Sequence, residues 1–222
     1  MKDNDEGQTV GEKPWVKPAL VPLRSGLLNK FGGRLEAAWM DAIDDVPIAD
    51  LLEQYGSPLF VVSEQRLRSN VQRIKRAFTS RYPSVVFGWS YKTNYLGAVS
   101  NIFHQEGSWA EVVSEFEYEK ARSLGVPGTN ILFNGPGKKP EALRRAAQEG
   151  AHIHIDHLDE LYALETITEE LETHIDVALR LNFDTGFTEP WSRFGFNVES
   201  GQAMDAAWRI AASKYLSLSG LH

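Results

Sequence analysis

The residues of this sequence that could carry chemistry follow short apolar runs. Six such runs begin near Val85, Ala110, Ile131, His152, Asp176 and Leu216. The polar residues that close them are Lys92, Glu111 with Ser114, Asn134 to Lys138, Asp156, Arg180 with Asn182, and His222. A lysine amine that loses its proton is a nucleophile and forms a Schiff base with a carbonyl compound. With a carboxylate, a guanidinium and an imidazole nearby, the set indicates covalent carbonyl chemistry at Lys92.

Lys92 lies in the stretch "WSYKTN", residues 89 to 94. Taken alone, a lysine at the end of a strand is a surface residue, because lysines are almost never fully buried. Here aromatic residues stand beside it, and we expect them to shield the amine and ease the loss of its proton. The other polar residues must then be brought to the same place by the fold.

The apolar runs alternate with helical patterns, which predicts a parallel sheet. The first four spacings are about 21 to 25 residues, the length of a strand–helix unit with a right-handed crossover. Helix boundary signals agree: Ser114 with Glu117 forms a capping box, Gly125 and Gly150 end helices, and Pro140 suits a first helical turn. In barrels of such units the active site is built from the carboxyl ends of the strands.

Three architectures fit six strands with a helical pattern after each of the first five. A doubly wound nucleotide-binding sheet requires a glycine-rich turn after its first strand, and this chain has "YKTNYLG" there. A complete (β/α)₈ barrel has eight strands in about 250 residues. Residues 85–222 are only 138 residues long and hold six predicted strands. We therefore predict an α/β fold that is a partial TIM barrel with about six of eight strands. An open six-stranded sheet is the alternative.

Three regions are expected along the chain. Residues 1–34 are polar and carry Pro14, Pro18 and Pro22, which predicts a flexible arm. Residues 35–63 are expected to form a helix up to Tyr55 and a strand at 59–62, separated by Gly-Ser-Pro. Residues 64–222 form the incomplete barrel and begin with a helix over about 64–78.

Composition excludes several function classes. A net charge of −7 and a pI near 5.4 argue against nucleic acid or an anionic membrane as partner. The chain has no cysteine, which excludes a disulfide framework, a thiolate metal site and a cysteine nucleophile. Its start lacks an export signal and no stretch approaches a membrane span, so a cytoplasmic location is expected.

Two local patterns suggest other sites. "HIHIDH" places His152 and His154 on one face of a strand, with His157 just beyond, and could indicate a barrel metallohydrolase. "NGPGKK", residues 134 to 139, could be a phosphate loop, but it lacks the spacing G-x-x-x-x-G-K-[ST], and a strand-to-helix turn fits it better.

Eight segments in order resemble one known family. They are "GSPLFVVSEQRLRSNVQRIKRAF", "FGWSYKTN", "WAEVVSEFEYEKARSLGV", "ILFNGPGKKPEAL", "IHIDHLDEL", "ALRLNF", "SRFGF" and "LSGLH". Together they resemble the amino-terminal part of the fold-type III pyridoxal-phosphate decarboxylases. The diaminopimelate decarboxylases are the most similar branch, and the ornithine and arginine decarboxylases are related to them. The resemblance runs from about Tyr55 to His222.

The resemblance implies an alanine-racemase-like barrel that binds pyridoxal 5'-phosphate. It implies that Lys92 holds the cofactor as an imine, that His222 stacks on the pyridine ring, and that Arg180 and Ser114 lie near the cofactor. Glu111 falls where the family usually has an aspartate, and "SRFG" has arginine where the family often has lysine. Ser114 is explained equally well as a helix cap.

The resemblance further implies decarboxylation of an amino acid, most similar to the conversion of meso-diaminopimelate to lysine, by a homodimer. Ornithine, arginine or lysine are alternative substrates. The family's glycine-rich phosphate loop, its "EPGR" segment and its carboxyl-terminal β-domain are not found in these 222 residues, so we expect the chain alone to be a poor catalyst. A non-catalytic relative that binds a partner is the alternative of another class.

Overall fold

The computed structural model describes residues 40–187 and 193–222. The chain divides into two compact units, Met1–Phe60 and Val61–His222. This division lies close to the expected start of the barrel region. The arm predicted for residues 1–34 lies outside the described residues.

The first unit differs from the predicted single helix. Strands β1 (Ala42–Ile43) and β2 (Val46–Pro47) pair antiparallel, and among residues 40–60 only α1 (Ile48–Tyr55) is helical. Asp44 and Asp45 have φ of 48° and 65°, the left-handed conformation of a tight hairpin turn. Aspartate tolerates that conformation better than most residues, and helical periodicity alone does not reveal it.

The strand predicted at residues 59–62 is also absent. These residues have no regular structure, and Phe60 is 98% exposed. An apolar run forms a strand only where a neighbouring strand offers hydrogen bonds and cover, and within the described residues this run pairs with none. The prediction was wrong because it rested on composition alone.

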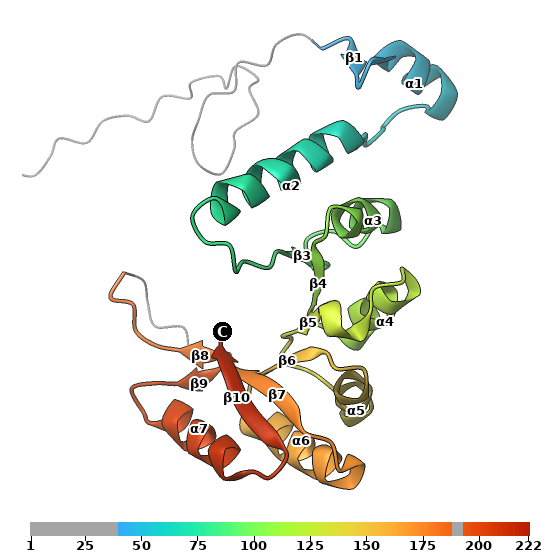
Figure 1. Cartoon of the computed structure of the whole chain (residues 1–222). Helices are drawn as coiled ribbons and strands as arrows, with labels where there is room; N and C mark the ends of the chain where they lie inside the picture. Colours follow the sequence, from blue (N-terminus) through green and yellow to red (C-terminus); the bar gives the residue numbers. More distant parts are fainter. Residues whose placement is uncertain (1–39, 188–192) are drawn as a thin grey trace, which may run out of the picture. The chain divides into compact units, whose positions relative to one another are not determined.

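The second unit is a six-stranded parallel sheet with its helices (Figure 1). The strands are β3 (Gly88–Ser90), β4 (Trp109–Val112), β5 (Ile131–Phe133), β6 (His152–Ile155), β7 (Ile175–Leu179) and β10 (Leu216–Leu221). The helices are α2 (Glu64–Thr79), α3 (Gly97–Gln105), α4 (Glu115–Ser123), α5 (Pro140–Gln148), α6 (Leu158–Leu171) and α7 (Gln202–Ala212), with a 3₁₀ turn at Gly128–Asn130.

The strands follow one another across the sheet in the order of the chain, β3-β4-β5-β6-β7-β10. A doubly wound sheet reverses its strand order at a switch point, and this sheet has no reversal. The sequential order is that of a barrel, so the predicted partial barrel is confirmed. A small parallel pair, β8 (Leu181–Asn182) with β9 (Phe196–Asn197), closes the base of the long loop after β7.

Residues alternate along each strand between two environments. Ala110, Val112, Ile153 and Ile155 are fully buried in the core cluster that also holds Leu143. The intervening residues point to the other face of the sheet, and there the chain places polar groups such as Glu111 and His154. The helix-covered face holds the fold together, and the inner face is available for chemistry.

The helix boundaries expected at Gly125, Pro140 and Gly150 are confirmed. Pro140 is the first residue of α5, and Gly125 and Gly150 follow helix ends with φ of 84° and 70°. No helix among the described residues is long and apolar enough to cross a bilayer.

Candidate active site

A hollow of about 380 Å³ opens where the carboxyl ends of the strands meet. Its volume lies in the range of small-molecule sites. It is lined by Ser90, Lys92, Glu111, Val113, Asn134, Gly135, Pro136, Arg180, Phe194 and His222. Four of the five residues expected at the site are therefore brought together at the carboxyl ends of four strands, although Lys92 and His222 are 130 positions apart in the sequence.

Lys92 lies in the turn that follows β3 and continues the alternation of that strand. Ser90 and Lys92 line the hollow, while Trp89 and Tyr91 point toward α3. The Trp89 ring stacks on Phe103 with centroids 3.6 Å apart, and the Tyr91 hydroxyl lies 2.8 Å from His104 Nε2. The aromatic residues therefore anchor the strand against its helix and do not cover the lysine. The expected shielding was wrong, and Lys92 is exposed.

His222 is held at the hollow by its backbone. Its N–H donates to Leu179 O, and its carbonyl accepts from Leu181 N, both at 2.8 Å. Burial lowers the pKa of His222, and the nearby Arg180 guanidinium lowers that pKa further. A neutral imidazole is thus favoured at neutral pH, which suits a ring that packs against another ring.

His154 lies beside His222 on the inner face of the sheet. The two ring centroids are 5.0 Å apart with an interplanar angle of 53°. Burial, and then the neighbouring His222, lower the pKa of His154 to about 4. Its Nδ1 is buried and has no hydrogen-bond partner in the described part of the chain. Sequence reasoning considered His154 only as a metal ligand.

Arg180 is fixed by a buried carboxylate. Its Nη1 lies 2.8 Å from Asp156 Oδ1, and its guanidinium carbon lies 4.8 Å from the centre of the Phe194 ring. The Asp156 side chain is 4% exposed, whereas that of Arg180 is 27% exposed. The guanidinium therefore has one end anchored inside the protein and the other available to the hollow.

Glu111 and Asn134 provide acceptor oxygens at the hollow. The absence of a side chain at Gly88 makes room for Glu111, since a Cβ there would lie 3.3 Å from Glu111 Cβ. Asn134 Oδ1 is buried and has no hydrogen-bond partner within the described residues. An unpaired buried polar atom is rare in a native protein, and this one is consistent with a donor that arrives with a ligand.

Ser114 does not line the hollow and acts as a helix cap. Its Oγ accepts a hydrogen bond from Glu117 N at 3.2 Å. Glu117 Oε2 in turn accepts from Val113 N at 2.8 Å, one residue before the cap. The capping half of the predicted box is confirmed, and the return hydrogen bond is displaced by one position. The structural interpretation of Ser114 is the one that its contacts support.

The "NGPGKK" segment is a strand-to-helix turn. Gly135 crosses so close to Val113 that a Cβ would lie 1.7 Å from Val113 O. Lys138 turns inward and pairs with Glu160 at 2.9 Å, with both side chains almost fully buried. Lys138 is therefore not available to a phosphate group, whereas Lys139 is exposed and pairs with Glu115. Sequence reasoning missed this ion pair and placed Lys138 on the rim.

The histidines of "HIHIDH" do not form a metal centre. The ring of His152 stacks on Trp109 at 4.8 Å. No group of three or more His, Cys, Asp or Glu residues in the described ranges is arranged to hold a metal ion. Nothing in the described residues supports the metallohydrolase alternative.

Residues 64–222 match the family model of the pyridoxal-dependent decarboxylases, in the part described as the pyridoxal-binding domain. The chain belongs to this family. It is 30% identical to the diaminopimelate decarboxylase of Bacillus subtilis over 201 residues and 29% identical to that of Methanocaldococcus jannaschii over 195 residues. These alignments cover 86% and 81% of this chain and 44% of each relative.

Solved structures agree with this assignment. The diaminopimelate decarboxylase of M. jannaschii in complex with L-lysine matches with a TM-score of 0.74 and 28% identity, over 82% of this chain and 45% of that one. The Helicobacter pylori enzyme, with 20% identity and a TM-score of 0.69, shows the fold. The chain spans under half the length of the relatives that it matches.

The residues of the hollow fit pyridoxal phosphate. The hollow has a suitable volume and three suitable side chains. Lys92 offers an amine for the aldehyde, His222 offers an imidazole with a lowered pKa for the ring, and Arg180 offers a guanidinium for an anionic or phenolic oxygen. The cofactor that the family requires is therefore compatible with this part of the decarboxylase fold.

Proposed function

We propose that this chain forms the cofactor-binding barrel of a pyridoxal-phosphate-dependent decarboxylase that converts meso-diaminopimelate to lysine. The observation that carries the proposal is the convergence of Lys92, Arg180 and His222 on one hollow, in a chain of the decarboxylase family. The names of its relatives support diaminopimelate as substrate. The reaction breaks the bond between Cα and a carboxylate, releases carbon dioxide, and places a proton on Cα.

In this proposal Lys92 holds the cofactor through its amine, because it is the lysine that lines the hollow. The Lys138 ammonium is bound to Glu160 and has no access to the hollow. His222 would pack its ring against the cofactor ring, and the lowered pKa of this histidine favours the neutral form. When bound, pyridoxal phosphate supplies the electron sink that decarboxylation requires.

Arg180 and Glu111 complete the proposed site with opposite charges. Arg180 offers its free edge to an oxygen of the cofactor or the substrate, since its other edge is bound to Asp156. Glu111 is close enough to His222 for its charge to raise the pKa of that histidine. Glu111 therefore partly offsets the effect of Arg180 on the imidazole. Ser114 supports the site as the cap of α4 and is not assigned a cofactor contact.

Borohydride reduction of the protein loaded with pyridoxal phosphate tests the proposal. We expect peptide mapping to find the reduced adduct on Lys92, and the Lys92→Arg variant to lose both the adduct and the cofactor absorbance. Lys139→Arg is the matched control, because Lys139 is exposed and pairs with Glu115 at 3.3 Å outside the hollow. Adduct on Lys138 or Lys139 in place of Lys92 would contradict the assignment.

The substrate is tested by carbon dioxide release from meso-diaminopimelate, L-ornithine, L-arginine and L-lysine. We expect the first to be preferred. A second substrate class is favoured by one relative, an L-glutamyl-[BtrI acyl-carrier protein] decarboxylase of Niallia circulans with 26% identity over 185 residues. Release only from a carrier-bound amino acid would assign the chain to that class.

A homodimer and a cytoplasmic location are part of the proposal. The acidic surface implied by a net charge of −7 supports a freely diffusing enzyme of small-molecule metabolism.

The competing function, a partner-binding relative without catalysis, predicts no cofactor absorbance. Retention of a lysine and a histidine at the hollow argues against it.

A further inference from the structure

Beneath the hollow lies a group of four charged side chains, Lys138, Glu160, Asp156 and Arg180, which we name the charge quartet. The first three are buried, and Arg180 is 27% exposed. Lys138 Nζ lies 2.9 Å from Glu160 Oε2, and Arg180 Nη1 lies 2.8 Å from Asp156 Oδ1. The two pairs are linked through the backbone, since Asp156 N donates to Glu160 Oε2 at 2.9 Å. The quartet joins the ends of β5, β6 and β7.

Glu160 also binds the loop that forms one wall of the hollow. Its Oε1 accepts from Lys138 N at 3.3 Å, and Lys138 Nζ donates to the carbonyl of Gly135. His157 Nε2 lies 3.0 Å from Pro136 O. Gly135 and Pro136 line the hollow, so the ion pair behind them fixes where that wall stands.

Stability alone does not explain a pair that is 0% and 2% exposed. Removing two charges from water costs several kcal/mol each, and apolar residues of similar volume are often as stable or more stable in such a place. What the apolar residues lack is directed hydrogen bonding. Glu160 makes three hydrogen bonds to groups on two different strand ends, and these bonds define a geometry.

We propose that the Lys138–Glu160 pair and Asp156 are positioning residues for cofactor binding: they set the 134–136 wall and the direction of the Arg180 guanidinium. The inference rests on the proposed function, because it gives Arg180 a ligand. Of the quartet, only Arg180 lines the hollow. The other three groups act through it and through the loop.

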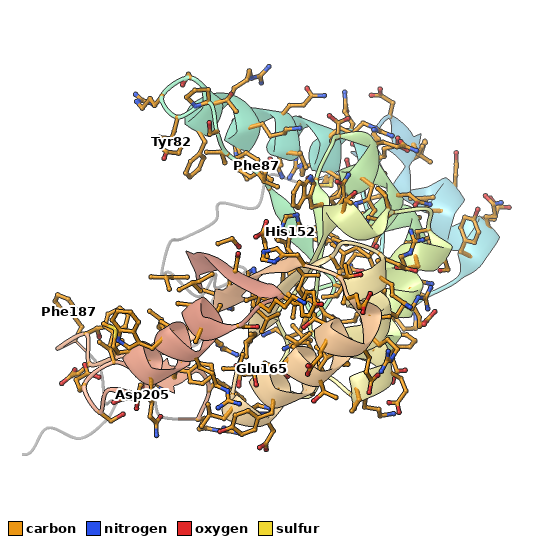
Figure 2. All side chains as sticks on the ribbon, turned by 60° about the horizontal axis from the view of Figure 1, so that its bottom comes forward. Tyr82, Phe87, His152, Glu165, Phe187 and Asp205 are labelled. Atoms are coloured by element: carbon orange, nitrogen blue, oxygen red, sulfur yellow. The ribbon has the colours of Figure 1, made fainter. Side chains whose placement is uncertain are left out.

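The first test needs no cofactor. Phenylglyoxal modifies accessible arginines, and its rate at Arg180 is read by peptide mass spectrometry. We expect Asp156→Asn and Glu160→Gln to raise this rate at least about threefold. Asp156→Asn removes the carboxylate that pairs with Arg180, and Glu160→Gln weakens the hydrogen bond that holds the backbone of Asp156. Glu165→Gln is the matched control. Glu165, labelled in Figure 2, lies on α6 like Glu160, but it pairs with Arg209 at a distance of 2.8 Å and does not line the hollow. Unchanged Arg180 rates in both quartet variants would overturn the inference.

The second test separates positioning from stability. In Lys138→Met/Glu160→Leu the pair becomes apolar, and we expect thermal unfolding of the cofactor-free protein to remain at or above the wild-type temperature. The dissociation constant for pyridoxal phosphate, from absorbance titration, should nevertheless rise at least about tenfold. Wild-type affinity in this folded variant would show that the pair has only a structural role.

Failure of the proposed function gives a different result. If the wild-type protein binds no pyridoxal phosphate while Arg180 reactivity still rises in the quartet variants, the quartet positions Arg180 for another ligand, and the cofactor assignment is wrong. If both proposals hold, Asp156→Asn and Arg180→Met should not be additive in their effect on cofactor affinity, because Arg180→Met removes the contact that Asp156 positions.

Discussion

At the scale of single residues, His222 is the side chain whose proposed role depends most on its charge. Its ring is kept neutral by burial and by Arg180, and it faces the hollow. Stacked rings contribute about 0.5–1.5 kcal/mol beyond the area that they bury. We therefore expect His222→Ala to weaken pyridoxal phosphate binding roughly 2- to 12-fold, since 1.4 kcal/mol is a factor of ten.

His222→Phe is the control for that prediction, because it keeps a flat ring and removes both nitrogens. It should bind the cofactor with nearly wild-type affinity in the same absorbance titration. If the phenylalanine variant is as weak as the alanine variant, the imidazole acts through a hydrogen bond or its charge, and the stacking role is contradicted.

The burial of His154 predicts how the stability of the protein depends on pH. The pKa of His154 in the folded state is about 4 because of burial, below the ordinary value of 6.5. Between these values the unfolded chain binds more protons than the folded one, so stability falls as pH is lowered from 6.5 toward 4. The lowered pKa of His154 corresponds to roughly 3 kcal/mol of stability, and the partial exposure of this side chain reduces that contribution.

We expect His154→Val to reduce this acid sensitivity. The free energy of unfolding, measured with urea at pH 7 and pH 4.5, should fall less in the variant than in the wild type. His104, whose pKa burial also lowers, remains in both proteins and cancels in the comparison. An equal loss in the two proteins would mean that His154 is hydrated or hydrogen-bonded in solution.

At the scale of elements, the turn from β5 to α5 is constrained by one close approach of two backbones. A Cβ at Gly135 would lie 1.7 Å from Val113 O and 2.7 Å from Val113 Cα. Both atoms belong to the backbone, so no side-chain rotation relieves the overlap. Gly135→Ala should therefore destabilise the fold by roughly 3 kcal/mol or more and distort the wall of the hollow.

Gly137→Ala in the same loop provides the comparison. A Cβ at Gly137 meets nothing within 4 Å, and alanine stabilises where the backbone allows it by restricting the unfolded chain. We expect this variant to unfold at or slightly above the wild-type temperature in a calorimetric scan. Equal destabilisation of both variants would place the constraint in the flexibility of the loop and not in the contact with Val113.

The sequence predicts elements well where local and long-range signals agree. Pro140, Gly125 and Ser114 mark helix ends by their own chemistry, and each is found in the expected place. The 59–62 run and the turn at Asp44 were misjudged, because a strand needs a partner and a hairpin needs two left-handed residues, neither of which appears in a pattern of apolar positions.

The site was predictable to the same extent. Strand order and alternation bring Lys92, Glu111, Arg180 and His222 to one hollow, and the sequence contains both signals. The pairing of Lys138 with Glu160 joins residues 22 positions apart on different elements, and nothing in the local sequence identifies the partner. Contacts between elements need the three-dimensional arrangement that the elements themselves create.

At the scale of the whole molecule, the sheet has two edges. Within the described residues β3 and β10 each pair with one strand, and β10 is the longest strand of the sheet. Beside it α7 exposes Met204 and Trp208, which is 69% exposed, and β10 exposes Leu221, which is 67% exposed. An exposed apolar edge strand is a template for pairing with another chain.

We therefore expect the 222-residue polypeptide to self-associate through β10 and α7. Sedimentation velocity should show species that grow with concentration, and Trp208→Lys with Leu218→Lys should shift them toward monomer, because lysine on an edge opposes strand pairing. Phe187→Lys is the control: Phe187 is 93% exposed and labelled in Figure 2, on the loop between β8 and β9. If Phe187→Lys alone abolishes association, the contact between chains does not form through β10 and α7. If the wild type stays monomeric at high concentration, β10 does not pair between chains and its edge is protected in another way.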